Sequence, residues 1–283
     1  MSVARVNRRE LLGAGLAVAA MPAAAGAAPS APAPPAGPWH GLRIGVASYT
    51  FRSFGLDALI AGTKRVGLDC VSLKEMHLPL KSAPEQRKAV ASRLRDAGVE
   101  PLSCGVIYLP NDEPGIRNAF EYTRDLGSPV MVCSFDPAIV GVLDRYVAEF
   151  DLRLAIHNHG PGDKRFSTPD VVWETIQNHD KRIGFCIDVG HTLRAGVDPA
   201  KAILKHRERL YDVHLKDVDR AEAKGGTLEA GRGVLDLKAV LAALVKIGFR
   251  GMADFEYEKD GADPLPGLAE SVGYCKGLMA GVK

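Results

Sequence analysis

Short apolar runs rich in β-branched residues recur along the chain from about residue 43 onward. Each run has the length of a strand rather than of a helix, and turn-forming residues bound most of them. The pattern predicts eight strands, over residues 43–48, 70–75, 101–107, 129–134, 152–157, 183–188, 210–215 and 250–256.

The segments between these runs have helical patterns. Helices are predicted over Ser82–Ala97, Pro169–Asn178, Pro199–His206 and Val234–Ile247, from apolar spacing on one face or from a proline in the first turn. Glycine stands where helices should end, at residues 67, 98, 127 and 248. Eight strands alternating with helices predict a parallel sheet, and this number closes most economically into a single (β/α)8 TIM barrel of the α/β class over residues 41–283.

The first forty residues do not follow this pattern. Met1–Arg9 has three arginines and only basic charge, Leu11–Met21 is a short apolar run, and alanines at 23, 25 and 27 offer small-residue cleavage sites. Asn7-Arg8-Arg9 resembles a twin-arginine (Tat) signal. We therefore expect a Tat-type signal peptide over residues 1–27 and a Pro/Ala-rich linker over 28–40. An ordinary secretory signal is the alternative. An uncleaved amphipathic helix is disfavoured, because the prolines that follow would interrupt it.

The leader implies that the Tat export machinery is a partner and that the mature protein is periplasmic or secreted, without membrane attachment after cleavage. The chain of 283 residues is 46% hydrophobic and 25% charged with a net charge of +2, typical of a globular protein. This charge gives no broad reason to bind nucleic acid. The five cysteines are odd in number and lack CxxC spacing, which predicts neither a disulfide framework nor a zinc cluster.

Polar residues stand at the carboxyl ends of the last four predicted strands: His157, Asp188, His214 and Glu256. In a TIM barrel these ends meet on one face, where active sites lie. Each residue alone would be explained as a hydrogen-bonding or capping residue, but together they form a mixed nitrogen and oxygen set for one divalent metal ion. Mn²⁺ is the expected ion, with Mg²⁺, Co²⁺ and Zn²⁺ as alternatives. The letters HNH at residues 157–159 also suggest a nuclease motif, which the apolar strand around them disfavours.

The segments LAIHNHG, FCIDVGHTLRAGVDP, YDVHLKDVD, GRGVLDL and DFEYE, in this order, resemble the sugar phosphate isomerase/epimerase superfamily, the xylose isomerase-like TIM barrels. The resemblance covers residues 42–280. It implies a metal held by Glu, Asp, His and Glu from strands five to eight. Asp188, His214 and Glu256 match this set, and His191 matches a histidine that contacts substrate. His157 departs from it, because ketose epimerases have a glutamate there.

The resemblance also implies roles around the metal. Glu256 is expected as the catalytic base and His157 or His159 as the opposite acid, while Lys216 could hold an oxyanion. Further substrate contacts are expected from Lys74, Glu75, His77, Arg194 and Arg232, although rim ion pairs or plain surface charges are alternatives for several of them.

These roles predict an isomerase or epimerase that removes a proton α to the carbonyl of a non-phosphorylated keto-sugar, which the metal polarises. A lyase or dehydratase acting on 3-keto-glycosides or inososes through the same enolate is the alternative. A non-catalytic periplasmic sugar-binding barrel is the third hypothesis. DNA repair is disfavoured by the signal peptide and by the lack of the extra histidines that a trinuclear zinc site needs. The oligomeric state is left open.

Overall fold

A computed structural model describes residues 37–282. Eight parallel strands form a closed barrel in the order β1-β10-β7-β6-β5-β4-β3-β2, which confirms the predicted TIM barrel. The strands are β1 (Arg43–Ala47), β2 (Cys70–Leu73), β3 (Glu100–Tyr108), β4 (Val130–Ser134), β5 (Arg153–His157), β6 (Ile183–Asp188), β7 (Leu210–Leu215) and β10 (Met252–Phe255).

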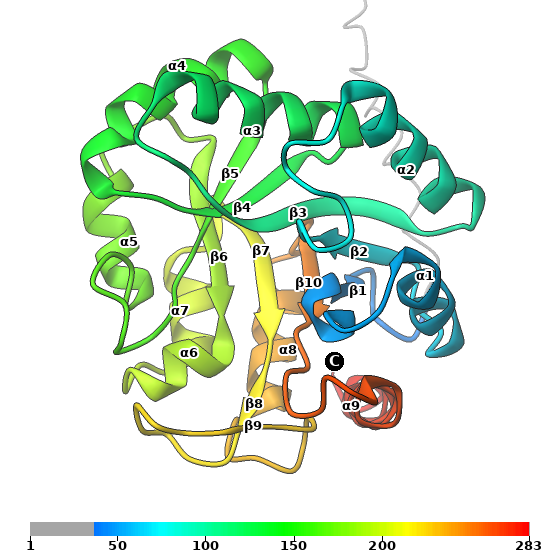
Figure 1. Cartoon of the computed structure of the whole chain (residues 1–283). Helices are drawn as coiled ribbons and strands as arrows, with labels where there is room; N and C mark the ends of the chain where they lie inside the picture. The colour runs from blue at the N-terminus through cyan, green and yellow to red at the C-terminus, as the bar shows by residue number, and fades with distance from the viewer. Residues whose placement is uncertain (1–36, 283) are drawn as a thin grey trace, which may run out of the picture. The chain divides into compact units, whose positions relative to one another are not determined.

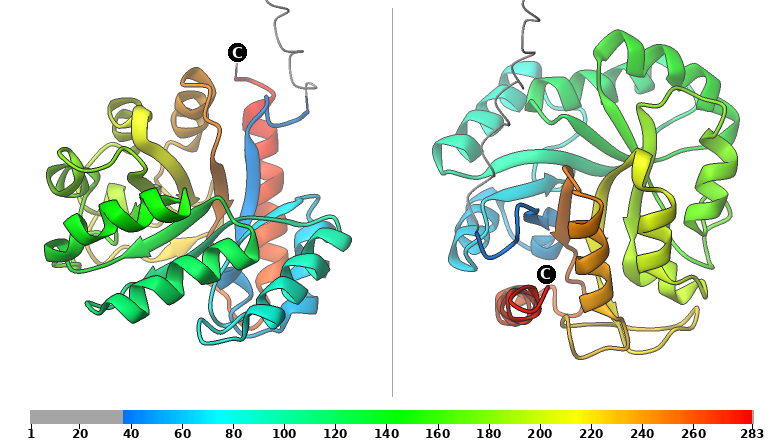
Figure 2. Two further views of the ribbon diagram at one scale, coloured as in Figure 1. Left: turned by 90° about the horizontal axis from the view of Figure 1, so that it is seen from above. Right: turned by 180° about the vertical axis from the view of Figure 1, so that it is seen from behind.

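Helices surround the strands in chain order (Figure 1). They are α1 (Leu56–Arg65), α2 (Pro84–Asp96), α3 (Glu113–Leu126), α4 (Val140–Phe150), α5 (Pro169–Ile176), α6 (Val189–Arg194), α7 (Pro199–Lys205), α8 (Leu237–Lys246) and α9 (Pro264–Met279). Three short 3-10 turns join them: η1 (Ser48–Phe51), η2 (Pro137–Ile139) and η3 (Arg207–Arg209). The last helix, α9, runs beside β1 in both views of Figure 2 and packs against α8. This arrangement covers the outer face of the barrel.

The predicted ends of the elements agree with the structure to within a few residues. The four glycines expected after helices all have positive φ, from 60° at Gly248 to 75° at Gly67. Strand β2 ends at Leu73, two residues before its predicted end, because the Lys74 N–H donates to Ser48 Oγ at 2.8 Å instead of continuing the strand ladder. A short antiparallel pair, β8 (Asp217–Val218) with β9 (Thr227–Leu228), was not predicted and lies beyond the end of β7.

All five cysteines are free and buried. Cys186 lies within reach of His157 and His214, so its position alone would permit metal binding. However, burial raises the pKa of its thiol well above the ordinary value, and Sγ donates to Asp212 Oδ1 at 3.7 Å. Cys186 is therefore a neutral thiol in the barrel interior.

The predicted signal peptide, and the predicted linker up to residue 36, lie outside the described residues, so both stay predictions. Among residues 37–282, no helix has the length and apolar character needed to cross a bilayer.

Gly184 marks a close approach between β6 and β7. A Cβ at this position would overlap the Arg209 carbonyl oxygen and the Tyr211 ring. We expect Gly184→Ala to lower the free energy of unfolding by about 1–3 kcal/mol, since β6 has no room to move within the barrel. Gly273→Ala is the matched control: its Cβ would meet nothing within 4 Å on the exposed face of α9, so it should stabilise by up to about 1 kcal/mol. Denaturant unfolding of both variants tests this, and equal stability of the two would contradict it.

Candidate metal centre and active site

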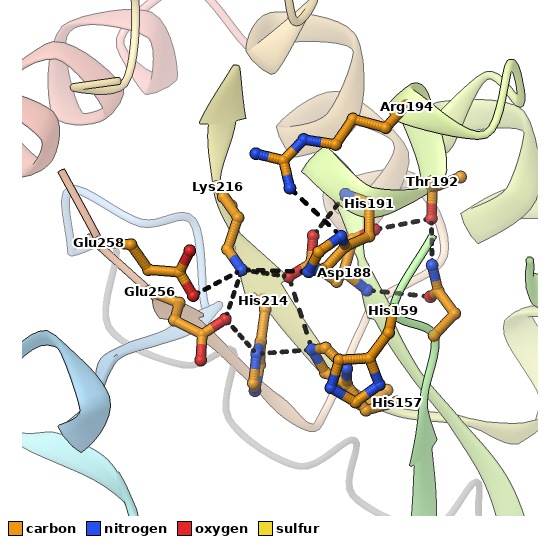
Figure 3. Close-up of polar contacts among 12 residues, drawn as sticks. His157, His159, Asp188, His191, Thr192, Arg194, His214, Lys216, Glu256 and Glu258 are labelled. Atoms are coloured by element: carbon orange, nitrogen blue, oxygen red, sulfur yellow. Dashed lines mark hydrogen bonds and ion pairs between the residues drawn. The ribbon is translucent and has the colours of Figure 1, made fainter. Parts of the chain in front are cut away.

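The last four strands of the barrel bring His157, Asp188, His214 and Glu256 together, as Figure 3 shows. The first three lie on β5, β6 and β7, and Glu256 directly follows β10. All four are buried, and one ligand atom from each lies within 4.8 Å of the others. We call these four residues the quartet.

The imidazole of His214 lies at the centre of the quartet. Its Nδ1 is 3.1 Å from His157 Nε2 and 3.3 Å from Glu256 Oε2. Its Nε2 faces away, 3.6 Å from Asp254 Oδ1. Burial would lower the pKa of His214, but the acidic groups around it, Asp254 first among them, together raise it well above the ordinary value. Asp254 is thus placed to accept a hydrogen bond from the Nε2 proton, so that Nδ1 faces the other quartet residues.

Asp188 combines two roles that the sequence treated as alternatives. Its Oδ1 accepts a hydrogen bond from the His191 backbone N–H at 2.7 Å and caps α6. Its Oδ2 points to the other quartet residues and lies 3.5 Å from His157 Nε2. A single carboxylate therefore anchors the helix and offers a ligand atom.

Lys216 places its ammonium among the carboxylates of the site (Figure 3). Its Nζ is 2.7 Å from Glu256 Oε2, 3.1 Å from Asp188 Oδ2 and 3.1 Å from Glu258 Oε1. Burial would lower the pKa of Lys216, but these three carboxylates raise it well above the usual value. In turn, Lys216 is the main reason that the pKa values of Asp188 and Glu256 stay well below the ordinary range despite burial. Lys216 is a permanent cation, and both carboxylates are ionised.

His159 and His191 flank the quartet on the side of β5 and α6. The His159 ring centre lies 4.3 Å from that of His157, and the His191 ring centre 5.9 Å from it. Burial lowers the pKa of His157 well below the usual value, lowers that of His159, and lowers that of His191 to about 4. These three imidazoles are neutral near pH 7.

Arg194, expected as a substrate contact, is the last residue of α6, and its Nη1 lies 3.3 Å from His191 Nδ1. The helix begins at the Asp188 cap, so it brings Arg194 to the site beside His191.

The residues expected after the second strand divide between the rim and the interior. Lys74 is half-buried between two tyrosine rings, and Glu75 is exposed beside a cavity. His77 is buried instead, with its Nδ1 3.2 Å from Ser48 Oγ. It contacts η1 rather than the open mouth.

Arg232 lies apart from the quartet, where it binds both oxygens of Glu270 on α9. The two glycines that flank Arg232 bind Asp217. Its carboxylate accepts hydrogen bonds from the backbone N–H groups of Gly231 at 2.8 Å and Gly233 at 3.1 Å. The GRGVLDL segment is thus folded around Asp217, and this fold turns Arg232 outward.

Sequence reasoning missed three acidic residues of this region: Glu258, Asp212 and Asp254. Each lies two positions from a quartet residue, and successive side chains of a strand alternate between faces. The period-two spacing in YDVHLK and ADFEYE was the signal that could have found them. Asp212 and Asp254 are fully buried beneath His214, and burial raises the pKa of both, to about 6 for Asp212.

Comparison with known proteins identifies the family of this barrel. The family model described as xylose isomerase-like TIM barrel matches residues 60–278. The chain belongs to this family. Among curated members, it is 31% identical over 206 residues to an inosose dehydratase of Geobacillus thermodenitrificans, spanning 66% of this chain and 68% of that protein.

The chain is also 31% identical over 145 residues to the rhizopine catabolism protein MocC of Rhizobium meliloti, covering 46% of this chain but only 42% of MocC. Several solved structures share the fold of this chain. An IOLI protein crystallised with a zinc atom superposes with a TM-score of 0.70 at 16% identity, over 86% of this chain and 99% of that one. The 3-keto-D-glucoside 4-epimerase YcjR of E. coli gives 0.66 at 15% identity, over 83% and 99%.

The quartet fits a divalent metal ion. It offers two imidazoles and two carboxylates, a donor set that suits such ions. The buried Asp188 Oδ2 accepts no hydrogen bond, although the Lys216 ammonium lies 3.1 Å from it, so this oxygen can still act as a ligand. A metal ion needs His214 in its neutral form. With that imidazole neutral, the carboxylates of Asp188, Glu256 and Glu258 outnumber the ammonium of Lys216, and the site favours a further cation.

Proposed function

We propose that this protein is a metal-dependent enzyme that removes the proton next to the carbonyl of a non-phosphorylated keto-sugar. The observation that carries the proposal is the buried quartet with ionised Glu256 in contact with Lys216. A divalent ion in the quartet, with Mn²⁺ as our first choice, would act as a Lewis acid toward the substrate carbonyl.

The protein's own residues would carry the protons and the charge. Glu256 is an ionised carboxylate and takes the proton from carbon. The Lys216 ammonium lies beside it and stabilises negative charge as it develops on the former carbonyl oxygen. His191 and Arg194 contact each other at the edge of the site and would orient substrate hydroxyls.

We infer that elimination is the outcome that follows. The C–H electron pair forms the new double bond and the carbon–oxygen bond of the β-hydroxyl breaks. Because His157 and His159 are neutral near pH 7, the leaving hydroxyl takes the proton that Glu256 accepted from carbon, and water leaves. The inosose dehydratase relative supports this reading. Imidazole in place of the second glutamate also supports it, because the proton-transfer pair is no longer symmetric.

Epimerisation or isomerisation is the second candidate. His159 and Glu256 come from β5 and β10, on different sides of the quartet, and so offer two groups for proton transfer. In this case the proton returns to the same or the neighbouring carbon and the carbon–oxygen bonds remain intact.

Incubation of the metal-loaded protein with inososes, 3-keto-glycosides and free ketoses in D₂O, followed by NMR, tests the proposal. Loss of water or of an aglycone supports elimination. Deuterium incorporation into an intact skeleton supports epimerisation. If no keto-sugar exchanges a proton, both proposed reactions, elimination and epimerisation, are wrong.

The restriction to non-phosphorylated sugars rests on the predicted Tat signal. We propose that the mature protein is periplasmic or secreted. Cell fractionation and sequencing of the mature N-terminus test this, and a cytoplasmic protein that begins at Met1 would contradict it.

Lys216→Met should shift the pH dependence of the reaction. Lys216 keeps the pKa of Glu256 well below its ordinary value, so its removal raises that pKa. A base must be ionised to act, and therefore the acidic limb of the kcat/KM profile should move to higher pH. The maximal rate should also fall by about 10²–10³-fold, as for loss of an oxyanion donor. Lys259→Met, which breaks an ion pair with Glu229 outside the quartet, is the control and should leave the limb in place.

A further inference from the structure

Tyr108, at the carboxyl end of β3, is an exposed aromatic residue at the mouth of the barrel. Its side chain is 54% exposed, although large aromatic rings are usually covered in a folded chain. The hydroxyl lies 3.3 Å from His159 Nε2, and the two rings are stacked with centres 6.0 Å apart. His159 thus holds the Tyr108 ring, while about half of the residue remains exposed.

Tyr108 is also held from the side of β2. The Lys74 ammonium lies 5.9 Å from the centre of the Tyr108 ring and 5.3 Å from that of Tyr49. A cation over a ring face restricts the ring's movement. The His159 and Lys74 contacts together fix the orientation of the Tyr108 ring, and about half of the residue stays exposed to a ligand.

A cavity of about 490 Å³ adjoins this ring, lined by Tyr108, His159, Gly162, Asp163, Lys164 and Arg165. Its size lies in the range of small-molecule sites. Because the His159 ring that lines this cavity is only 4.3 Å from the ring of His157, the cavity lies next to the quartet. Its wall combines an aromatic ring with one acidic and two basic side chains, which suits the apolar face and the hydroxyls of a sugar ring.

We propose that this cavity is a subsite for the second sugar ring of a glycoside whose keto-sugar ring reacts at the quartet, with Tyr108 as its stacking platform. The proposal rests on the proposed function for the position of the reacting ring, and it names the substrate class as keto-disaccharides rather than free ketoses. Tyr108 binds and orients the substrate and takes no part in proton transfer.

Calorimetric titration of the metal-loaded protein with cellobiose, maltose and glucose measures the contribution of the second ring without any turnover. We expect at least one disaccharide to bind about tenfold more tightly than glucose. Tyr108→Ala should abolish this advantage, and Tyr108→Phe should keep it because the ring remains. Tyr274→Ala, which truncates a comparably exposed tyrosine on α9, is the matched control and should keep it too.

If Tyr108→Ala still binds a disaccharide more tightly than glucose, the subsite assignment is wrong. Equal affinity of the unmodified protein for all three sugars would also overturn it. If only p-nitrophenyl β-glucoside shows a Tyr108-dependent advantage, the pocket takes an aromatic aglycone and the assignment to a sugar ring is wrong. Tyr108-dependent binding of a disaccharide supports the subsite even if no keto-sugar is turned over, a result that would contradict only the proposed function.

Discussion

Glu256→Gln should reduce kcat by about 10²–10⁴-fold, the range expected when a general base is lost. The substitution keeps the size of the side chain and an oxygen that can still contact a metal ion, but the amide cannot accept a proton from carbon. We therefore expect weaker metal binding together with a much larger loss of turnover. Steady-state kinetics with a keto-sugar substrate and metal analysis on the same preparation separate these two effects.

Glu229→Gln is the matched control for Glu256→Gln. Glu229 is also buried and also ion-paired to a lysine, with its Oε2 2.9 Å from Lys259 Nζ, but it lies outside the quartet. The Glu229→Gln variant should retain most of the activity. If Glu256→Gln turns over substrate at the normal rate, Glu256 is not the base. If the unmodified protein binds sugars without turnover and Glu256→Gln binds them equally well, the barrel is a binding protein.

Removal of a quartet ligand should release the metal ion. His157→Ala, Asp188→Ala and His214→Ala each take one of four ligands from a buried site, so each variant should lose stoichiometric metal after dialysis. The unmodified protein should gain about 2.7 kcal/mol of stability when free metal is at 100 times its Kd, or about 5–10 °C in Tm. The three variants should lose this gain, and metal analysis with thermal unfolding measures both effects.

The metal prediction has a pH dependence of known sign. Asp254 raises the pKa of His214, and a protonated imidazole cannot bind a metal ion. Metal affinity should therefore fall as the pH is lowered, and uptake should release protons. His179→Ala is the control, because its Nδ1 pairs with Asp144 at 2.8 Å outside the quartet. If all three quartet variants keep stoichiometric metal, the ligand assignment is wrong.

Much of the fold followed from local pattern. Apolar runs of strand length alternate with helical segments, and helix-ending glycines such as Gly98 and Gly127 adopt the positive φ that this position requires. The same pattern placed His157, Asp188 and His214 at successive strand ends. Parallel strands in a barrel point the same way, and so their carboxyl ends must meet on one face.

Other features could not be inferred from local pattern, because they depend on side-chain directions and loop paths. The sequence places Lys216 on the strand face of His214 and Arg232 in a loop. It does not show that Lys216 meets three carboxylates or that Arg232 turns outward to Glu270. His77 and Tyr108 both follow or end strands, yet one is buried against Ser48 and the other is exposed beside a cavity.

The sequence by itself therefore determined the barrel, the family resemblance and the residue types of the metal centre. Strand spacing and alternation of faces are local properties, and they decide which residue stands at each strand end. Only the tertiary structure decided the Lys216 contacts, the double role of Asp188 and the Tyr108 cavity. These depend on closure of the barrel, which brings residues far apart in the chain within a few ångströms and lets charge, burial and packing select one arrangement.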